Sequence, residues 1–266
     1  MFDSKKGNRI VDNQITRLQE AFQRHCRLAT TPVAVKLARE GETPPPRVKY
    51  PLEHVGHRLA VCQGMTIART MGWAVAFRKE DHGCPFPRIF MGHVPADRFL
   101  EGKVADYYLD DPRRMRAMEA SYPRWKDEPY REIWLAPVTA CDFQPDLVVA
   151  YGNPAQILVM IHGANYQIGT GLTSVSTGRF GCSAWIAGVP QSDECTYLIP
   201  GPGERVFAGT QDHEMSFAVP LSKIEAFIAG LDYVRSRKMF RYPVPKMPAL
   251  SEPRIPEKYF EIDPDQ

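Results

Sequence analysis

The sequence predicts one domain of the α/β or α+β class, in which helices flank a mixed β-sheet. Short apolar runs typical of strands occur at 32–37, 73–77, 133–136, 146–151, 196–199 and 214–219. Apolar residues recur with helical spacing at 11–28, 59–71, 153–163 and 220–234. Helical and extended segments therefore alternate along the chain, as expected for helices that pack on a sheet.

Residues at the ends of these segments explain where several of them begin and end. Pro32 ends the first helical segment, and Gly72 follows the second at a position typical of a C-cap. Asn153 is a favoured N-cap residue, and Pro154 suits the first helical position. Residues 146–163 are therefore predicted to form a strand, a tight turn and a helix.

The domain is expected to cover residues 1–239, a length that can bury a sizeable core without disulfides. From residue 240 to 266 the chain is punctuated by prolines but still carries apolar side chains. We expect this segment to form an extended tail that packs on the domain or on a neighbouring subunit. The sequence leaves open whether the protein is a homo-oligomer.

Composition argues against several classes of partner. The formal net charge is only +2 and no run of basic residues occurs, so nucleic acid is not an expected partner. No stretch of about 18 apolar residues could span a membrane. The polar N-terminus does not resemble a signal peptide, so a cytoplasmic location is expected.

Three of the six cysteines lie where chemistry is expected. Cys62, Cys84 and Cys182 each fall at a predicted junction between a loop and a helix, with glycine one or two residues away. Backbone N–H groups at such junctions favour the thiolate, which is the form that binds zinc or an iron–sulfur cluster. The alternative is that each is a buried thiol acting as a small apolar side chain. None of the three lies in a Cys-x-x-Cys pair, so their spacing does not exclude this alternative. The remaining cysteines are expected to be structural, although Cys195 is a fourth ligand candidate.

Three polar residues are candidates for catalysis or substrate binding. His82 lies two residues before Cys84, and Arg205, in a loop rich in glycine and proline, could bind a carboxylate through two hydrogen bonds. Glu214 would share a strand face with Asp212. Each has a simpler interpretation: His82 as an exposed histidine, Arg205 as part of a structural turn, and Glu214 as part of a solvated strand edge. The glycine- and threonine-rich loop at 169–179 could hold an anion, or could equally be a structural turn.

The chain resembles the prokaryotic family called domain of unknown function 169. The matching pieces, in chain order from about 15 to about 235, are TPVAVKL at 31–37, CQ at 62–63, AR at 68–69, EDHGCP at 80–85, NPAQ at 153–156, Cys182, GER at 203–205 and DHEM at 212–215. The family's activity is not established. The resemblance implies a shared site at Cys62, Cys84 and Cys182. Many members carry another cysteine shortly before the Gly-x-Arg piece, but here Ile199 to Pro202 holds none.

The leading hypothesis is a [4Fe–4S] cluster on the three cysteines, with one iron left open to a small carboxylate or oxygen substrate, or used for electron transfer. Such a protein could be a cluster-dependent oxidoreductase or lyase, with a small-molecule substrate or a redox partner protein. A zinc site completed by His82 is one alternative. A metal-free small-molecule binding protein and a single reactive thiol are the others.

Overall fold

A computed structural model describes residues 4–97, 108–237 and 255–262 of the chain. Within these residues no helix combines the length and the apolar character needed to cross a bilayer. Most of the tail predicted over 240–266 lies outside the described residues. Its described part contains the exposed 3₁₀ helix η7 (Glu257–Glu261).

A six-stranded sheet forms the centre of the domain, with the strand order β2-β3-β1-β4-β6-β5. The strands are β1 (Val33–Ala38), β2 (Val75–Phe77), β3 (Glu132–Pro137), β4 (Leu147–Gly152), β5 (Thr196–Leu198) and β6 (Met215–Pro220). All pairings between these strands are antiparallel, and two isolated parallel bridges lie beside them. The predicted class of a sheet flanked by helices is confirmed, in its α+β form, but the sheet is antiparallel where a mixed sheet was expected.

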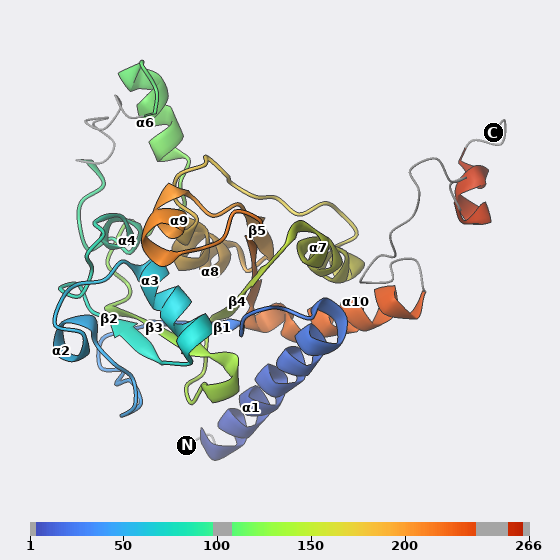
Figure 1. Ribbon diagram of the computed structural model, residues 1–266, viewed down its shortest axis with the longest axis horizontal. Coiled ribbons are helices and arrows are strands. Elements are labelled where there is room, and N and C mark those ends of the chain that lie inside the picture. The colour runs from blue at the N-terminus through green and yellow to red at the C-terminus, as the bar shows by residue number, and fades with distance from the viewer. Residues whose placement is uncertain (1–3, 98–107, 238–254, 263–266) are drawn as a thin grey trace.

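Helices cover both faces of the sheet (Figure 1). One face packs against α1 (Ser4–Ala21), α7 (Pro154–Ile168) and α10 (Ile224–Ser236). The other packs against α3 (Val61–Thr66), α4 (Phe86–Phe90), the π-helical turn η5 (Ala184–Gly188) and α8 (Val189–Ser192). Successive side chains of a strand point to opposite faces of the sheet. In β1, Val33 and Val35 therefore pack on the side of α3 and α4, and Ala34 packs on the side of α1 and α7.

Shorter elements complete the described chain. They are the π-helical turns η1 (Phe22–Cys26) and η2 (Ile67–Met71), the helices α2 (Pro51–His54), α6 (Pro112–Ala120) and α9 (Pro202–Ala208), and the 3₁₀ helices η4 (Val138–Ala140) and η6 (Leu221–Lys223). The two helices predicted at 11–28 and 59–71 thus each end in a π-helical turn. The loop predicted around Arg205 is instead helix α9, because Pro202 stands at its first turn and the Glu204 carboxylate accepts the Gly201 N–H.

Helices α7 and α10 approach each other through two glycines. A Cβ atom on Gly230 of α10 would overlap the carbonyl oxygen of Gly163 on α7. The Gly163 position is also close, because a Cβ there would lie 2.8 Å from the Leu231 side chain. These two residues therefore set the spacing of the helix pair that covers one face of the sheet.

We expect Gly230→Ala to lower the free energy of unfolding by about 1–3 kcal/mol, because the added methyl forces the two helices apart. Chemical denaturation followed by circular dichroism measures this. Gly171→Ala is the matched control, since a Cβ at Gly171 meets no atom within 4 Å. Equal stability of the two variants would contradict the close packing of α7 on α10.

Candidate functional site

The fold brings Cys62, Cys84 and Cys182 to the wall of one cavity of about 270 Å³. Cys62 lies in the first turn of α3, Cys84 in the turn before α4, and Cys182 two residues before η5. All three are half-buried free thiols. We call this cavity, defined by the three cysteines, the cysteine pocket.

Backbone hydrogen bonds hold two of the three cysteine segments together. The Gly83 N–H donates to the Leu59 carbonyl at 2.7 Å, and the Leu59 N–H donates to the Asp81 carbonyl at 3.2 Å. These bonds fix the turn before Cys84 against the chain that enters α3. The Gln63 side chain accepts the Ala60 N–H at 2.7 Å and so caps that helix at the turn that carries Cys62.

The sulfur of Cys62 also faces helix α9, since it lies 3.9 Å from the Gly203 carbonyl oxygen. Helix α9 packs on α3 through a hydrogen bond of 2.8 Å from the Thr66 hydroxyl to the Ala208 carbonyl. Glu204 of α9 lines the cysteine pocket, and a Cβ on Gly181 would lie 2.5 Å from its carboxylate. Glycine beside Cys182 therefore allows this carboxylate to approach the chain closely.

Burial keeps the three thiols protonated. It raises the pKa of Cys62 to about 12, with the nearby Glu204 carboxylate adding to the effect. Burial raises the pKa of Cys182 well above its usual value, and Glu204 contributes there too, while burial also raises the pKa of Cys84. Hydrogen bonds from the backbone N–H groups of Gln63 and Phe86 act in the opposite direction on Cys62 and Cys84. A positive charge in the pocket would be needed to make these sulfurs thiolates.

His82 lies outside the lining of the cysteine pocket. Its ring stacks on Phe77 with 5.4 Å between centroids and lies 6.4 Å from the ring of His93. Both ring nitrogens are buried without a hydrogen-bond partner, and burial lowers the pKa of His82 to about 3. Across the described residues, no three His, Cys, Asp or Glu side chains are grouped so that they could hold one metal ion.

The other two predicted polar residues also make contacts away from the cysteines. The Arg205 guanidinium donates to the Gln211 carbonyl at 2.6 Å. Glu214 forms a buried, two-pronged ion pair with Arg69, at 2.5 and 2.9 Å, and accepts the Gln211 N–H at 2.8 Å. Neither Arg205 nor Glu214 lines the cysteine pocket, and their catalytic roles stay predictions, as does that of His82.

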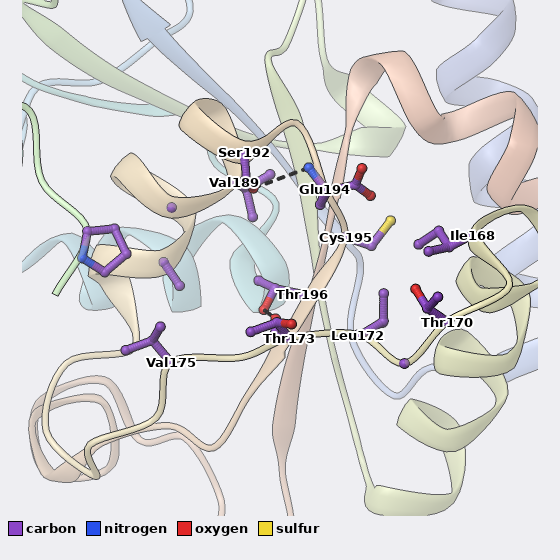
Figure 2. A pocket seen from close by; sticks show the side chains of 14 residues that line it. Ile168, Thr170, Leu172, Thr173, Val175, Val189, Ser192, Glu194, Cys195 and Thr196 are labelled. Atoms are coloured by element: carbon purple, nitrogen blue, oxygen red, sulfur yellow. Dashed lines mark hydrogen bonds between the residues drawn. The ribbon is translucent and has the colours of Figure 1, made fainter. Parts of the chain in front are cut away.

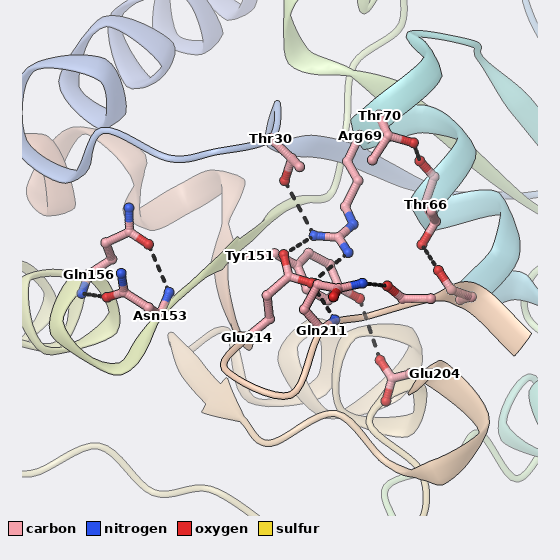
Figure 3. A network of polar contacts seen from close by, with 12 residues as sticks. Thr30, Thr66, Arg69, Thr70, Tyr151, Asn153, Gln156, Glu204, Gln211 and Glu214 are labelled. Carbon is pink, nitrogen blue, oxygen red and sulfur yellow. Dashed lines mark hydrogen bonds and ion pairs between the residues drawn. The ribbon is translucent and has the colours of Figure 1, made fainter. Parts of the chain in front are cut away.

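A chain of contacts nevertheless joins Glu214 to the pocket (Figure 3). The Arg69 guanidinium lies 4.2 Å from the centre of the Tyr151 ring. The Tyr151 hydroxyl points to Glu204 at 3.4 Å, and Glu204 accepts the Gly201 N–H at 2.8 Å. Strand β4, which carries Tyr151, is thereby tied to both η2 and α9.

Sequence reasoning did not select Glu204 or Arg179, although both line the pocket. Glu204 had a local signal, because a Glu three residues after Gly201 is typical of a helix N-terminus. Arg179 closes the glycine-rich loop that was considered as an anion site, and its guanidinium pairs with Glu119 at 3.2 Å. That partner is 60 residues away, so no local pattern indicates the pair.

A larger cavity, of about 440 Å³, lies elsewhere (Figure 2). The stretch from Ile168 to Val175 forms one wall, and Cys195 lies on another. Its described lining includes Glu194 but no Lys or Arg, so the first part of the predicted anion loop meets no cation there. Only the end of that loop, at Arg179, reaches the cysteine pocket.

We expect Glu214→Gln to destabilise the fold by about 3 kcal/mol at neutral pH, because it leaves Arg69 buried without its partner. Burial raises the pKa of Glu214, but the hydrogen bonds from Arg69 and Gln211 outweigh this and hold it below its usual value. The contribution of the pair is therefore present above the unfolded pKa of about 4.3 and is lost as the pH falls through the folded pKa.

Denaturant titrations of the wild type and the variant at neutral and acidic pH measure this difference, which should shrink in acid. Glu225→Gln is the control, because its partner Arg17 is half exposed and the pair joins two surface helices at 2.5 Å. That change should cost about 1 kcal/mol or less. Equal losses for the two variants would show that the Arg69–Glu214 pair has no special structural role.

Comparison with known proteins shows the family to which this chain belongs. The model of domain of unknown function 169, described as uncharacterised ArCR, matches residues 21–230. The uncharacterized protein MJ0308 of Methanocaldococcus jannaschii is 24% identical over 209 residues, which cover 76% of this chain and 87% of that protein. No solved structure matches the chain. The chain therefore belongs to the family of domain of unknown function 169.

Proposed function

We propose that the protein binds a [4Fe–4S] cluster through Cys62, Cys84 and Cys182. The observation that carries this proposal is the meeting of three free thiols, from three separate segments, in one cavity. The six cysteines are spread over the whole chain, so this gathering is a property of the fold and not of local sequence. The other three cysteines do not line the cysteine pocket.

The donor set suits a cluster better than a single metal ion. In a cluster each cysteine binds its own iron, so three sulfurs need not converge on one point. The described residues contain no group of three His, Cys, Asp or Glu side chains arranged for one metal ion. Backbone N–H groups at Gln63 and Phe86 point to sulfur, as is typical where a protein tunes a cluster's potential.

The size and lining of the cavity also support a compact inorganic group. Its volume of about 270 Å³ lies near the lower limit of small-ligand pockets, which span about 300–1,000 Å³. Phe86 and Phe180 line it and would limit the access of water. Burial raises the pKa of each pocket thiol and so favours the neutral form of the sulfur. The positive charge of iron would lower these pKa values and stabilise the thiolates.

When bound, such a cluster supplies either an iron with an open position for a substrate oxygen or a carrier of single electrons. Both activities are compatible with an oxidoreductase or a lyase. Glu204 lines the pocket, and burial raises the pKa of its carboxyl group. It could therefore hold a proton close to a substrate, while the hydrogen bonds from Gly201 and Tyr151 keep its carboxylate in place.

A metal-free small-molecule site is the second candidate, favoured by the mostly apolar wall and the single Arg179 of the same pocket. A reactive thiol is a weaker alternative, because the pKa of each pocket cysteine is raised and not lowered. Free thiols throughout the chain are consistent with our proposal of a reducing, cytoplasmic location. A small molecule or a redox partner protein would be the second reactant.

We expect protein purified without oxygen to contain about four iron and four sulfide ions per chain and to be brown. Cys62→Ser, Cys84→Ser and Cys182→Ser should each lower the iron and sulfide content severalfold, because each removes one thiolate ligand. Cys141→Ser is the matched control: Cys141 is also a half-buried cysteine, but its thiol donates to the Phe143 carbonyl outside the pocket. Iron, sulfide and zinc analysis of all five proteins measures the outcome.

Circular dichroism of the same samples separates ligand loss from unfolding. Colourless wild-type protein that carries one zinc ion per chain would refute the cluster and favour the zinc alternative. Iron content that falls equally in the Cys141→Ser protein would show that the pocket cysteines are not the ligands. Iron retained in all three pocket variants would also reject the proposal.

A further inference from the structure

We infer that the rim of the cysteine pocket binds an aromatic monocarboxylate, with Arg179 holding the carboxylate and the aromatic side chains around it holding the ring. As an account of substrate, this inference rests on the proposed function, because the open iron is what would act on the bound molecule. As an account of binding, it rests on the described side chains alone.

Arg179 is the cation of this pocket. Among the described lining residues no other Lys, Arg or His occurs, and the Arg179 residue is only 6% exposed. Its Nη1 donates to Glu119 at 3.2 Å, but its Nε is buried without a hydrogen-bond partner. The same Nη1 also donates to the Met115 sulfur at 3.7 Å. A guanidinium has five donor hydrogens, and both of these bonds come from Nη1 alone. A carboxylate from a ligand is the group that this fork fits best.

Aromatic rings pack against the guanidinium. Its carbon lies 4.2 Å from the centre of the Tyr108 ring and 4.6 Å from that of Phe180. The ring of Phe180 in turn packs on Phe86, with 3.9 Å between centroids. A flat ring placed beside the guanidinium would meet aromatic faces, which favours an aromatic ligand over an aliphatic chain.

The outer lining is apolar and unusually exposed. Phe207 is 62% exposed, Val206 is 76% exposed and Tyr108 is 48% exposed, and all three line the pocket. Large apolar side chains that gather at the mouth of a cavity are typical of a ligand site, because a ligand would remove their surfaces from water. The apolar body of the ligand would therefore lie against α9.

Glu204 limits the charge that the ligand can carry. It lies on the side of the pocket that faces Cys62 and Cys182 and is buried. A second carboxylate on the ligand would meet this acid with no second cation among the described lining residues. The pocket should therefore accept one carboxylate, at Arg179, and reject dicarboxylates.

Benzoate is the probe for this inference. Calorimetric titration of benzoate into cluster-free, thiol-reduced protein, and into protein reconstituted with iron and sulfide, should give saturable binding of one molecule per chain. Benzamide, which keeps the ring but lacks the charge, and acetate, which lacks the ring, should each bind about tenfold more weakly or worse. Phthalate should bind more weakly than benzoate, because its second carboxylate meets Glu204.

The decisive variant removes both members of the buried pair, Arg179→Met with Glu119→Gln. The single change would leave the Glu119 carboxylate buried without a partner, whereas the double change removes both charges. We expect the double variant to bind benzoate about tenfold more weakly or worse, and thermal unfolding checks that it remains folded. Phe207→Ala, at an exposed position, should weaken binding severalfold without a change in stability.

Arg17→Met with Glu225→Gln is the matched control, because it also removes an Arg–Glu pair, one that joins α1 and α10 outside the pocket. It should leave benzoate affinity within about twofold of the wild type. Loss of binding in this control, unchanged binding in the double variant, or equal binding of benzamide and benzoate would overturn the inference. Benzoate binding by a protein that takes up no iron would refute the cluster and keep this site. Protein that contains the cluster but does not bind benzoate would refute this site and keep the cluster.

Discussion

Glu204 is the side chain on which the candidate site depends, because it ties together three of the segments around it. Its carboxylate accepts N–H groups from Gly201 and Gly181 and lies within reach of the Tyr151 hydroxyl. These contacts fix the start of α9, the turn that carries Cys182, and strand β4. A buried carboxylate is costly unless it is hydrogen-bonded, so the three donors and the carboxylate hold each other in place. Glycine at position 181 is part of the same constraint, because a Cβ there would lie 2.5 Å from the Glu204 carboxylate.

The electrostatics of the cysteine pocket follow from this arrangement. Burial raises the pKa of Glu204 and of each pocket cysteine, and Glu204 adds to the effect at Cys62 and Cys182. Without a metal ion close to the sulfurs, the pocket therefore favours neutral, protonated thiols. A metal cluster would reverse that preference, because its charge stabilises thiolates. Glu119 offsets the charge of Arg179, while the Arg179 Nε keeps no hydrogen-bond partner in the protein.

Features of the fold that depend on local residues could be predicted from the sequence. The strand, turn and helix around Asn153 and Pro154 appear as expected, because capping and proline geometry act within a few residues. Helix α9 was missed, because its glycines and prolines outweighed the capping signal of Glu204. The π-helical ends η1 and η2 have no sequence pattern of their own.

The candidate site was predicted only in part, for a related reason. The positions of Cys62, Cys84 and Cys182 at loop–helix junctions are local properties, and all three residues line the pocket. Partners of the polar residues are not local: Glu214 pairs with Arg69, 145 residues away, and the His82 ring turns to Phe77 and His93. Spacing along the chain does not reveal which way such side chains point.

Three cysteine ligands would leave one iron of the proposed [4Fe–4S] cluster open. Mössbauer spectroscopy of protein reconstituted with ⁵⁷Fe tests this most directly, because it distinguishes irons with different ligands. We expect a cluster in which one of the four irons differs from the rest, and a spectrum that changes when benzoate is added. Four equivalent sulfur-ligated irons, or iron that does not form a cluster, would contradict it.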